Sequence, residues 1–270
     1  MRILLTNDDG ISAPGLKVAE EIAASIAGPE DEVWVVAPAF EQSAVSHCVS
    51  YVRAMRIEPL GPRRFAVEGS PADCAIAGIL DVMGGEPPDL LISGVNRGHN
   101  VAEDTLYSGT IGGALEGMFQ GVKSIALSQY YGPDHGEGKD AFDSSRAHGA
   151  EVVRSLLEAD RWTDRGRGVL YNVNFPAVTA EATRGIKTTF QGSRPGPTFG
   201  VQPQTAPNGR RYLWLTHNHG NAAVAEGGDA RECHDGWITV TPLVPDLTAH
   251  DMIDPLSQTL NRSWGANGGL

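Results

Sequence analysis

The sequence predicts an α/β fold in which helices cover both faces of a largely parallel sheet, giving a three-layer αβα sandwich. Six short runs of β-branched and aliphatic residues are apolar at successive positions, which is typical of strands buried on both faces. Helix-like segments separate the first five runs over residues 1–176, and this alternation predicts right-handed crossovers between parallel strands. The runs are RILLT, VWVVAP, LLISGVN, SIALSQ, VLYNVNFP and WITVTPL. This order of elements predicts a Rossmann-like core.

Helix signals occupy the gaps between these runs. Pro14 and Gly15 open a segment with apolar residues at helical spacing, and Gly28 is placed to end it. Residues 110–121 and 141–159 are the later helix candidates, and the second is the more amphipathic. Asp73 is placed to cap a further helix start, where Cys74 is expected to pack as a small apolar residue.

The second half of the chain differs in composition. Residues 179–236 are rich in Gly, Pro and polar residues, and Asn208-Gly209 before RRYLWLT predicts a hairpin turn. We therefore divide the chain into a Rossmann-like core (1–178), a β-hairpin arm outside the main sheet (179–236), and a returning strand with a C-terminal tail (237–270). Together these parts form one domain.

The arm and the tail predict an oligomer. An isolated hairpin is marginal in water, and the tail has few apolar anchors, so both gain stability by packing on another surface. Exchange between identical subunits provides such a surface at low cost. The apolar anchors of the tail are Met252, Ile253, Leu256, Leu260 and Trp264.

Composition narrows the functional class. The chain has 270 residues, 41% of them hydrophobic and 20% charged, as in ordinary globular proteins, and its formal net charge is −12. That charge argues against a surface for a nucleic-acid polymer. The three cysteines have no paired spacing, and neither a signal peptide nor a membrane-spanning run is visible. We expect a cytoplasmic protein with reduced thiols.

The stretch TNDDG suggests a metal site. Side chains on a strand alternate between its faces, so Asp8 and Asp9 converge only if the chain has already turned, as Gly10 permits. Parallel strands in α/β sheets present ligand sites beyond their carboxyl ends, where Ser43, Ser46 and Asn96 follow two other strands. Carboxylate, hydroxyl and amide oxygens favour one Mg²⁺ or Mn²⁺ ion over Zn²⁺.

A phosphate site is also predicted. Ser108, Gly109 and Thr110 stand just before a helix start, where backbone N–H groups and the helix dipole favour an anion. Tyr107 is placed either to stack on a base or sugar or simply to pack. His217 and His219 fit a hairpin rim better than a metal site, and His47 and His135 are expected to lie outside the catalytic machinery.

These motifs resemble those of the SurE family, the stationary-phase survival nucleotidases, in order from residue 3 to about 250. The resemblance implies a metal-dependent phosphatase for nucleoside 5′- and 3′-monophosphates, with some activity on short polyphosphate. It also implies a homodimer with exchanged segments, in some members paired into a tetramer. The matching stretches are ILLTNDDG, VVAP followed by Ser43, EGSPADC, ISGVNRGHN, YSGT, NVNFP and ITVTPLVPDLT.

Carried onto this sequence, the resemblance implies a set of site residues. The metal ligands would be Asp8, Asp9, Ser43 and Asn96. The phosphate site would be lined by Asn100, Ser108, Gly109 and Thr110, with Ser46 close by. Two stretches depart from the family pattern: Ala39-Phe40-Glu41, where the family has a polar start to the loop, and 229–233, where Arg231 and Glu232 are unusual.

The predicted reaction is metal-assisted hydrolysis of a phosphomonoester. We assign catalytic roles to Asp8, Asp9 and Asn96, with Asp9 either activating water or attacking phosphorus. An aspartyl-phosphate phosphatase is a rival, but those enzymes normally separate two aspartates by one residue and supply a later lysine, which NDDG does not match. A nucleotide-binding stress protein without turnover is the rival of another class.

Overall fold

The computed structural model describes residues 1–131, 140–163, 168–196, 198–217 and 225–261. His135, His219 and Trp264 lie outside the described residues. The central element is a nine-stranded sheet, and its strand order from one edge to the other is β3 (Ile57–Gly61), β4 (Arg64–Val67), β2 (Glu32–Pro38), β1 (Arg2–Thr6), β5 (Leu90–Arg97), β6 (Lys123–Gln129), β7 (Leu170–Phe175), β11 (Ile238–Leu243) and β8 (Ile186–Thr188).

Six neighbouring strands of this sheet, β4 to β7 in the spatial order above, are parallel. At one edge β3 pairs antiparallel with β4, and at the other β11 pairs antiparallel with β7 and parallel with β8. The predicted α/β class with a largely parallel sheet is therefore confirmed. All six predicted strands are present, and β3, β4 and β8 are additions at the edges of the sheet.

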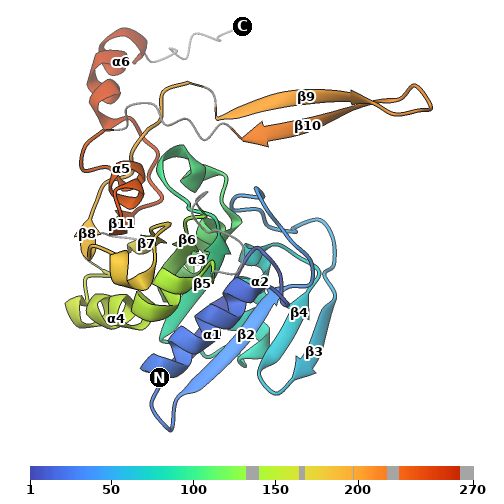
Figure 1. Cartoon of the computed structure of the whole chain (residues 1–270), viewed down its shortest axis with the longest axis vertical. Coiled ribbons are helices and arrows are strands. Elements are labelled where there is room, and N and C mark those ends of the chain that lie inside the picture. Colours follow the sequence, from blue (N-terminus) through green and yellow to red (C-terminus); the bar gives the residue numbers. More distant parts are fainter. Residues whose placement is uncertain (132–139, 164–167, 197, 218–224, 262–270) are drawn as a thin grey trace, which may run out of the picture.

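Two helical layers cover the sheet (Figure 1). Helices α1 (Pro14–Ile26) and α4 (Asp143–Ala159) pack on one face, and α2 (Pro71–Ala77) and α3 (Gly109–Phe119) pack on the other. The alternation along β1 shows why: Ile3 and Leu5 join the core under α1 and α4, whereas Leu4 joins the core under α2 and α3. The expected three-layer sandwich is thus built from strands that are apolar on both faces.

Helix starts follow the predicted chemistry. Pro14 is the first residue of α1, where its missing N–H costs nothing. At α2, Ser70 and Asp73 form a capping box, in which each side chain accepts a hydrogen bond from the other residue's backbone N–H. Gly15 lies against β5: a Cβ there would stand 1.9 Å from the Val95 carbonyl oxygen, so only glycine allows this close approach.

The predicted hairpin is present as a separate two-stranded sheet of β9 (Phe199–Thr205) and β10 (Arg211–His217), which extends away from the main sheet (Figure 1). Gly209 has a φ of +80° beside Asn208, as the turn requires. The hairpin is shorter than the arm predicted over 179–236, because β8 joins the main sheet and α5 (Asp229–His234) packs against β11. The missed β8 has only three residues, too few to show a periodic pattern.

Short helical turns complete the described chain. They are η1 (Gly78–Val82), η2 (Ala102–Leu106), η3 (Ala180–Ala182) and η4 (His250–Met252). The C-terminal tail contains α6 (Ile253–Leu260), which has no buried residue and lies apart from the main sheet (Figure 1). In the ranges that the structure describes, no helix combines the length and the apolar character needed to cross a membrane.

Candidate active site

A turn after β1 brings the side chains of the adjacent residues Asp8 and Asp9 to the same side of the chain. The Asn7 side chain donates to the Gly10 carbonyl oxygen at 3.0 Å and accepts from the Gly10 N–H at 3.2 Å. Gly10 has a φ of +100°, a conformation that L-residues rarely adopt. The chain has therefore left the strand at Asp8 and Asp9, and both side chains face the same space.

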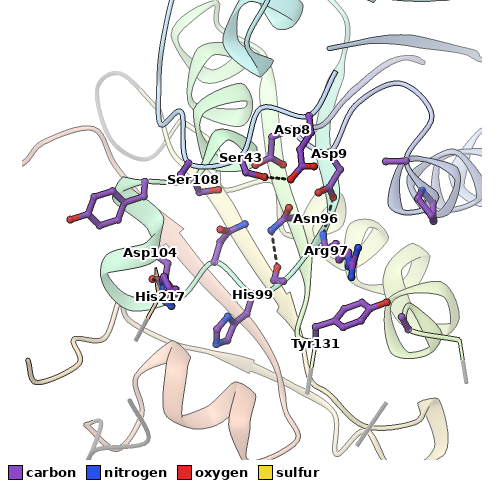
Figure 2. A pocket seen from close by; sticks show the side chains of 18 of the residues that line it. Asp8, Asp9, Ser43, Asn96, Arg97, His99, Asp104, Ser108, Tyr131 and His217 are labelled. Carbon is purple, nitrogen blue, oxygen red and sulfur yellow. Dashed lines mark hydrogen bonds and ion pairs between the residues drawn. The ribbon is translucent and has the colours of Figure 1, made fainter. Parts of the chain in front are cut away.

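That space is a cavity of about 710 Å³ at the carboxyl ends of the parallel strands (Figure 2). Polar residues reach it from the end of β1, the loop after β2, the end of β5 and the segment after it, and the start of α3. Six of the predicted site residues line it together: Asp8, Asp9, Ser43, Asn96, Asn100 and Ser108. Gly109, Thr110 and Ser46 do not line it.

Thr110 and Gly109 lie behind Asp8. The Thr110 hydroxyl is fully buried and donates to Asp8 Oδ1 at 2.6 Å. A Cβ on Gly109 would stand 2.9 Å from the Asp8 Cβ, so glycine is what lets α3 start this close to the turn after β1. The Thr110 hydroxyl therefore holds the Asp8 carboxylate in place rather than facing the cavity, and Gly109 leaves room for Asp8.

Ser46 fastens the loop after β2. Its hydroxyl donates to the Leu106 carbonyl oxygen at 2.7 Å, and its backbone N–H donates to the Tyr107 carbonyl oxygen at 2.9 Å. His47, next in sequence, places Nε2 2.8 Å from Glu116 Oε2 on α3. The loop that carries Ser43 is thus anchored to η2 and to the segment that leads into α3.

The two aspartates are poorly solvated. Burial raises the pKa of the Asp8 carboxyl from 3.8 to about 7, with the Asp9 charge adding to the rise and the Thr110 hydroxyl opposing it. Burial also raises the pKa of Asp9, against the hydrogen bond that its Oδ2 accepts from the Arg97 backbone N–H at 3.0 Å. A cation bound in the cavity would offset the cost of placing the buried Asp8 carboxylate beside the half-buried Asp9 carboxylate.

The donors around them fit a hard divalent cation. The Asn96 amide nitrogen donates to the Gly98 carbonyl oxygen at 2.9 Å, so that its own oxygen is left for the cavity (Figure 2). The Ser43 hydroxyl donates to Glu41 Oε1 at 2.7 Å, so the lone pairs of the Ser43 oxygen remain available to a cation. Within the described residues no cluster of three or more His, Cys, Asp or Glu side chains is arranged for a metal. The mixed set of two carboxylates, a hydroxyl and an amide oxygen therefore favours Mg²⁺ or Mn²⁺ over Zn²⁺.

The buried charge predicts a pH effect on the chelated protein. The folded chain keeps a proton on Asp8 up to about pH 7, whereas an unfolded aspartate releases it near 3.8, so folding loses stability as the pH rises between these values. Asp8→Asn is expected to stabilise the protein in EDTA at pH 8, by up to about 4 kcal/mol. Urea unfolding should show an advantage that grows from pH 5 to pH 8. An advantage that stays constant over this range would contradict the proposed cause.

Asn100 is held by a buried network of amides. Its Nδ2 donates to Ser128 Oγ at 2.8 Å, and its backbone N–H donates to Asn174 Oδ1 at 2.7 Å. Asn172 Nδ2 donates to the Asn100 carbonyl oxygen at 2.7 Å. Strands β6 and β7 thereby fix the segment before η2, which explains the polar residues within the otherwise apolar strand LYNVNF.

Several cavity residues were not predicted. Glu41 belongs to the stretch that departs from the family pattern, and Arg97 follows Asn96 directly. Phe199 and His217 come from the two ends of the hairpin, one at the start of β9 and one at the end of β10. Only the path of the hairpin relative to the sheet places them here, and no local sequence motif indicates it.

This chain is similar to known proteins in both sequence and fold. Residues 3–196 match the family described as Survival protein SurE. The 5′-nucleotidase SurE of Roseobacter denitrificans is 54% identical over 257 residues, which cover 95% of this chain and 98% of the relative. The 5′-nucleotidase SurE of Ruegeria sp. is 55% identical, with the same 95% and 98% coverage. The crystal structure of the SurE protein from Aquifex aeolicus is similar with a TM-score of 0.78 and 30% identity, covering 96% of this chain and 99% of that one.

Proposed function

Because this chain belongs to the SurE family, we propose that it is a 5′-nucleotidase that hydrolyses nucleoside monophosphates to nucleoside and phosphate with one divalent cation per subunit. We also propose nucleoside 3′-monophosphates as substrates of the same reaction, and short polyphosphate as a secondary substrate. The observation that carries the proposal is the single cavity in which the carboxylates of Asp8 and Asp9 meet hydroxyl and amide groups from three strand ends and a helix start. Relatives named 5′-nucleotidase SurE cover nearly the whole chain, so this cavity falls within the shared sequence.

The cation would be held by Asp8, Asp9, Ser43 and Asn96. When bound, it supplies positive charge that neutralises the carboxylates and the phosphoryl oxygens. The cavity needs such a charge because Asp8, Asp9 and Glu41 all line it, whereas Arg97 is the one Arg or Lys among its described lining residues. A phosphate dianion would otherwise enter against a negative field.

The protein's own groups orient the substrate. Ser108 Oγ accepts from the Ile111 N–H at 3.1 Å, so its hydroxyl hydrogen is available to a phosphate oxygen. The Asn100 side chain lines the same cavity, fixed by Ser128. Asp9 is held in one orientation by a hydrogen bond from the Arg97 backbone N–H. We assign to Asp9 one of two roles: it accepts the proton of the attacking water, or it attacks phosphorus itself.

Turnover separates this function from simple nucleotide binding. Purified full-length protein with Mn²⁺ is expected to release inorganic phosphate from AMP, with a rate proportional to enzyme concentration. Phosphate release is the readout, and calorimetric titration with AMP measures binding alongside it. Binding of AMP without any phosphate release would contradict the proposal and favour a nucleotide-binding protein without catalysis.

We further propose that the subunits form a homodimer or homotetramer with exchanged segments. The hairpin exposes Val201, Leu213, Trp214 and Leu215, and α6 exposes Ile253, Leu256 and Leu260. An eight-residue helix with no buried side chain is not stable on its own in water. A second subunit that covers these residues supplies the missing burial.

We also propose that the protein acts in the cytoplasm. All three cysteines are unpaired: Cys48 is exposed, and Cys74 and Cys233 are buried apart from one another. Burial raises the pKa of the Cys74 and Cys233 thiols well above the ordinary range, so both stay protonated. Three unpaired thiols suit a reducing compartment.

A further inference from the structure

One wall of the cavity is aromatic and has no part in the chemistry described above. Tyr107, Phe199 and His217 line it together. The rings of Tyr107 and Phe199 meet edge to face with centroids 5.1 Å apart, and those of Phe199 and His217 do the same at 5.2 Å. Tyr107 remains 43% exposed, although it lies in a cavity beside two other rings. Its ring therefore offers a surface to a ligand.

Ion pairs and hydrogen bonds hold this wall in place at the root of the hairpin, where β9 begins at Phe199 and β10 ends at His217. His217 Nε2 lies 2.9 Å from Asp104 Oδ1, and Arg194 Nη2 donates to Asp104 Oδ2 at 2.7 Å. Arg194 also donates to the Glu103 carboxylate, through its backbone N–H at 3.0 Å and its guanidinium at 3.3 Å. The Arg194 and Asp104 side chains are only 8% and 10% exposed. This ion-pair network ties His217, at the end of β10, and Arg194, which precedes β9, to η2.

The position of the wall relative to the phosphate site suits one part of the substrate. Tyr107 directly precedes Ser108, which caps α3 at the phosphate end of the cavity. Figure 2 shows His217 and Asp104 on the side of Ser108 that lies away from Asp9 and Arg97. A ligand whose phosphate lies at Ser108 would thus place its other end against these rings. In a nucleotide, that end is a flat aromatic base.

Two other aromatic residues of the cavity, Tyr131 and Phe142, suit a base less well. The guanidinium of Arg97 lies over the Tyr131 ring, 5.1 Å from its centroid, and occupies that face. Phe142 is 5% exposed and packs edge to face with Tyr131. The wall beside Ser108 is therefore the better candidate of the two.

We propose that Tyr107, Phe199 and His217 form a nucleobase subsite, so that the root of the hairpin selects nucleotides over phosphate esters that lack a base. The inference rests on the proposed phosphatase function of the same cavity. Stacking on an aromatic ring is available to every base, so the subsite accepts purine and pyrimidine nucleotides alike. Arg194 and Asp104 are positioning residues, because they act on the subsite through His217 and η2.

AMP and ribose 5-phosphate make a matched pair of substrates, since they share the sugar and the phosphate and differ by the base. Wild-type protein is expected to favour AMP in kcat/KM. Tyr107→Ala and Phe199→Ala are each expected to lower the AMP to ribose 5-phosphate ratio about 10-fold, mainly through KM for AMP. Tyr107→Phe keeps the ring and should keep the ratio, which separates stacking from a general loss of structure.

Controls separate the subsite from the hairpin as a whole and from the opposite wall. Tyr212→Ala removes an exposed ring from the same hairpin outside the cavity and should leave the ratio unchanged. The subsite is refuted if Tyr212→Ala lowers the ratio as much as Phe199→Ala does, if Tyr131→Ala alone lowers it, or if the wild type shows no preference for AMP. Absence of phosphate release from both substrates in the wild type would instead refute the phosphatase function itself.

Discussion

Asp9→Asn is expected to lower kcat/KM for AMP about 1,000-fold while the protein stays folded. The substitution keeps the size of the side chain and its hydrogen bond from the Arg97 backbone N–H, because an amide oxygen also accepts. It removes one of the two carboxylates that would hold the cation, and it removes the group assigned to react with water or phosphorus. Steady-state phosphate release from AMP measures the loss, and circular dichroism checks the fold.

Ser43→Ala is the matched comparison for this prediction. Ser43 lines the same cavity but contributes a neutral hydroxyl oxygen. This hydroxyl already donates a hydrogen bond to Glu41 Oε1 at 2.7 Å. Its removal deletes a ligand without changing the charge, so we expect a loss of about 10-fold. Losses that are mild and equal for the two variants would contradict the roles given to Asp9 and to the cation.

Much of the fold could be predicted because the central strands are apolar on both faces. In β1 the successive residues Ile3, Leu4 and Leu5 serve opposite cores, which leaves a continuous apolar run in the sequence. The edge strands lack this pattern: β3 is exposed at every residue, and β8 has only three residues. Their assignment depends on pairing with neighbours far away in sequence, which no local window reports.

The polar residues of the site were predictable to the extent that they follow strand ends. Asp8, Asp9 and Asn96 meet because parallel strands finish at the same edge of the sheet. The inward turn of Thr110 toward Asp8 was not predictable, because it depends on how closely α3 approaches β1. Phe199 was missed for a related reason, since the hairpin reaches the cavity only through the folded path of the chain.

Removal of the cation is the second change with a large expected effect. Without it, the carboxylates of Asp8 and Asp9 oppose the entry of a phosphate dianion, and desolvation, which raises the pKa of both groups, leaves little water to screen their charge. Activity on AMP should therefore fall to background in excess EDTA. Because the fold has a core on each face of the sheet that does not include the site, the protein should remain folded and the loss should be reversible.

The most direct test of the account is therefore a metal titration of chelated, dialysed protein, with phosphate release from AMP as the readout. The account predicts that Mg²⁺ or Mn²⁺ restores full activity at one bound ion per subunit, and that Asp9→Asn gives neither stoichiometric binding nor recovery. Full activity of the wild-type protein in excess chelator would contradict a divalent cation at Asp8 and Asp9.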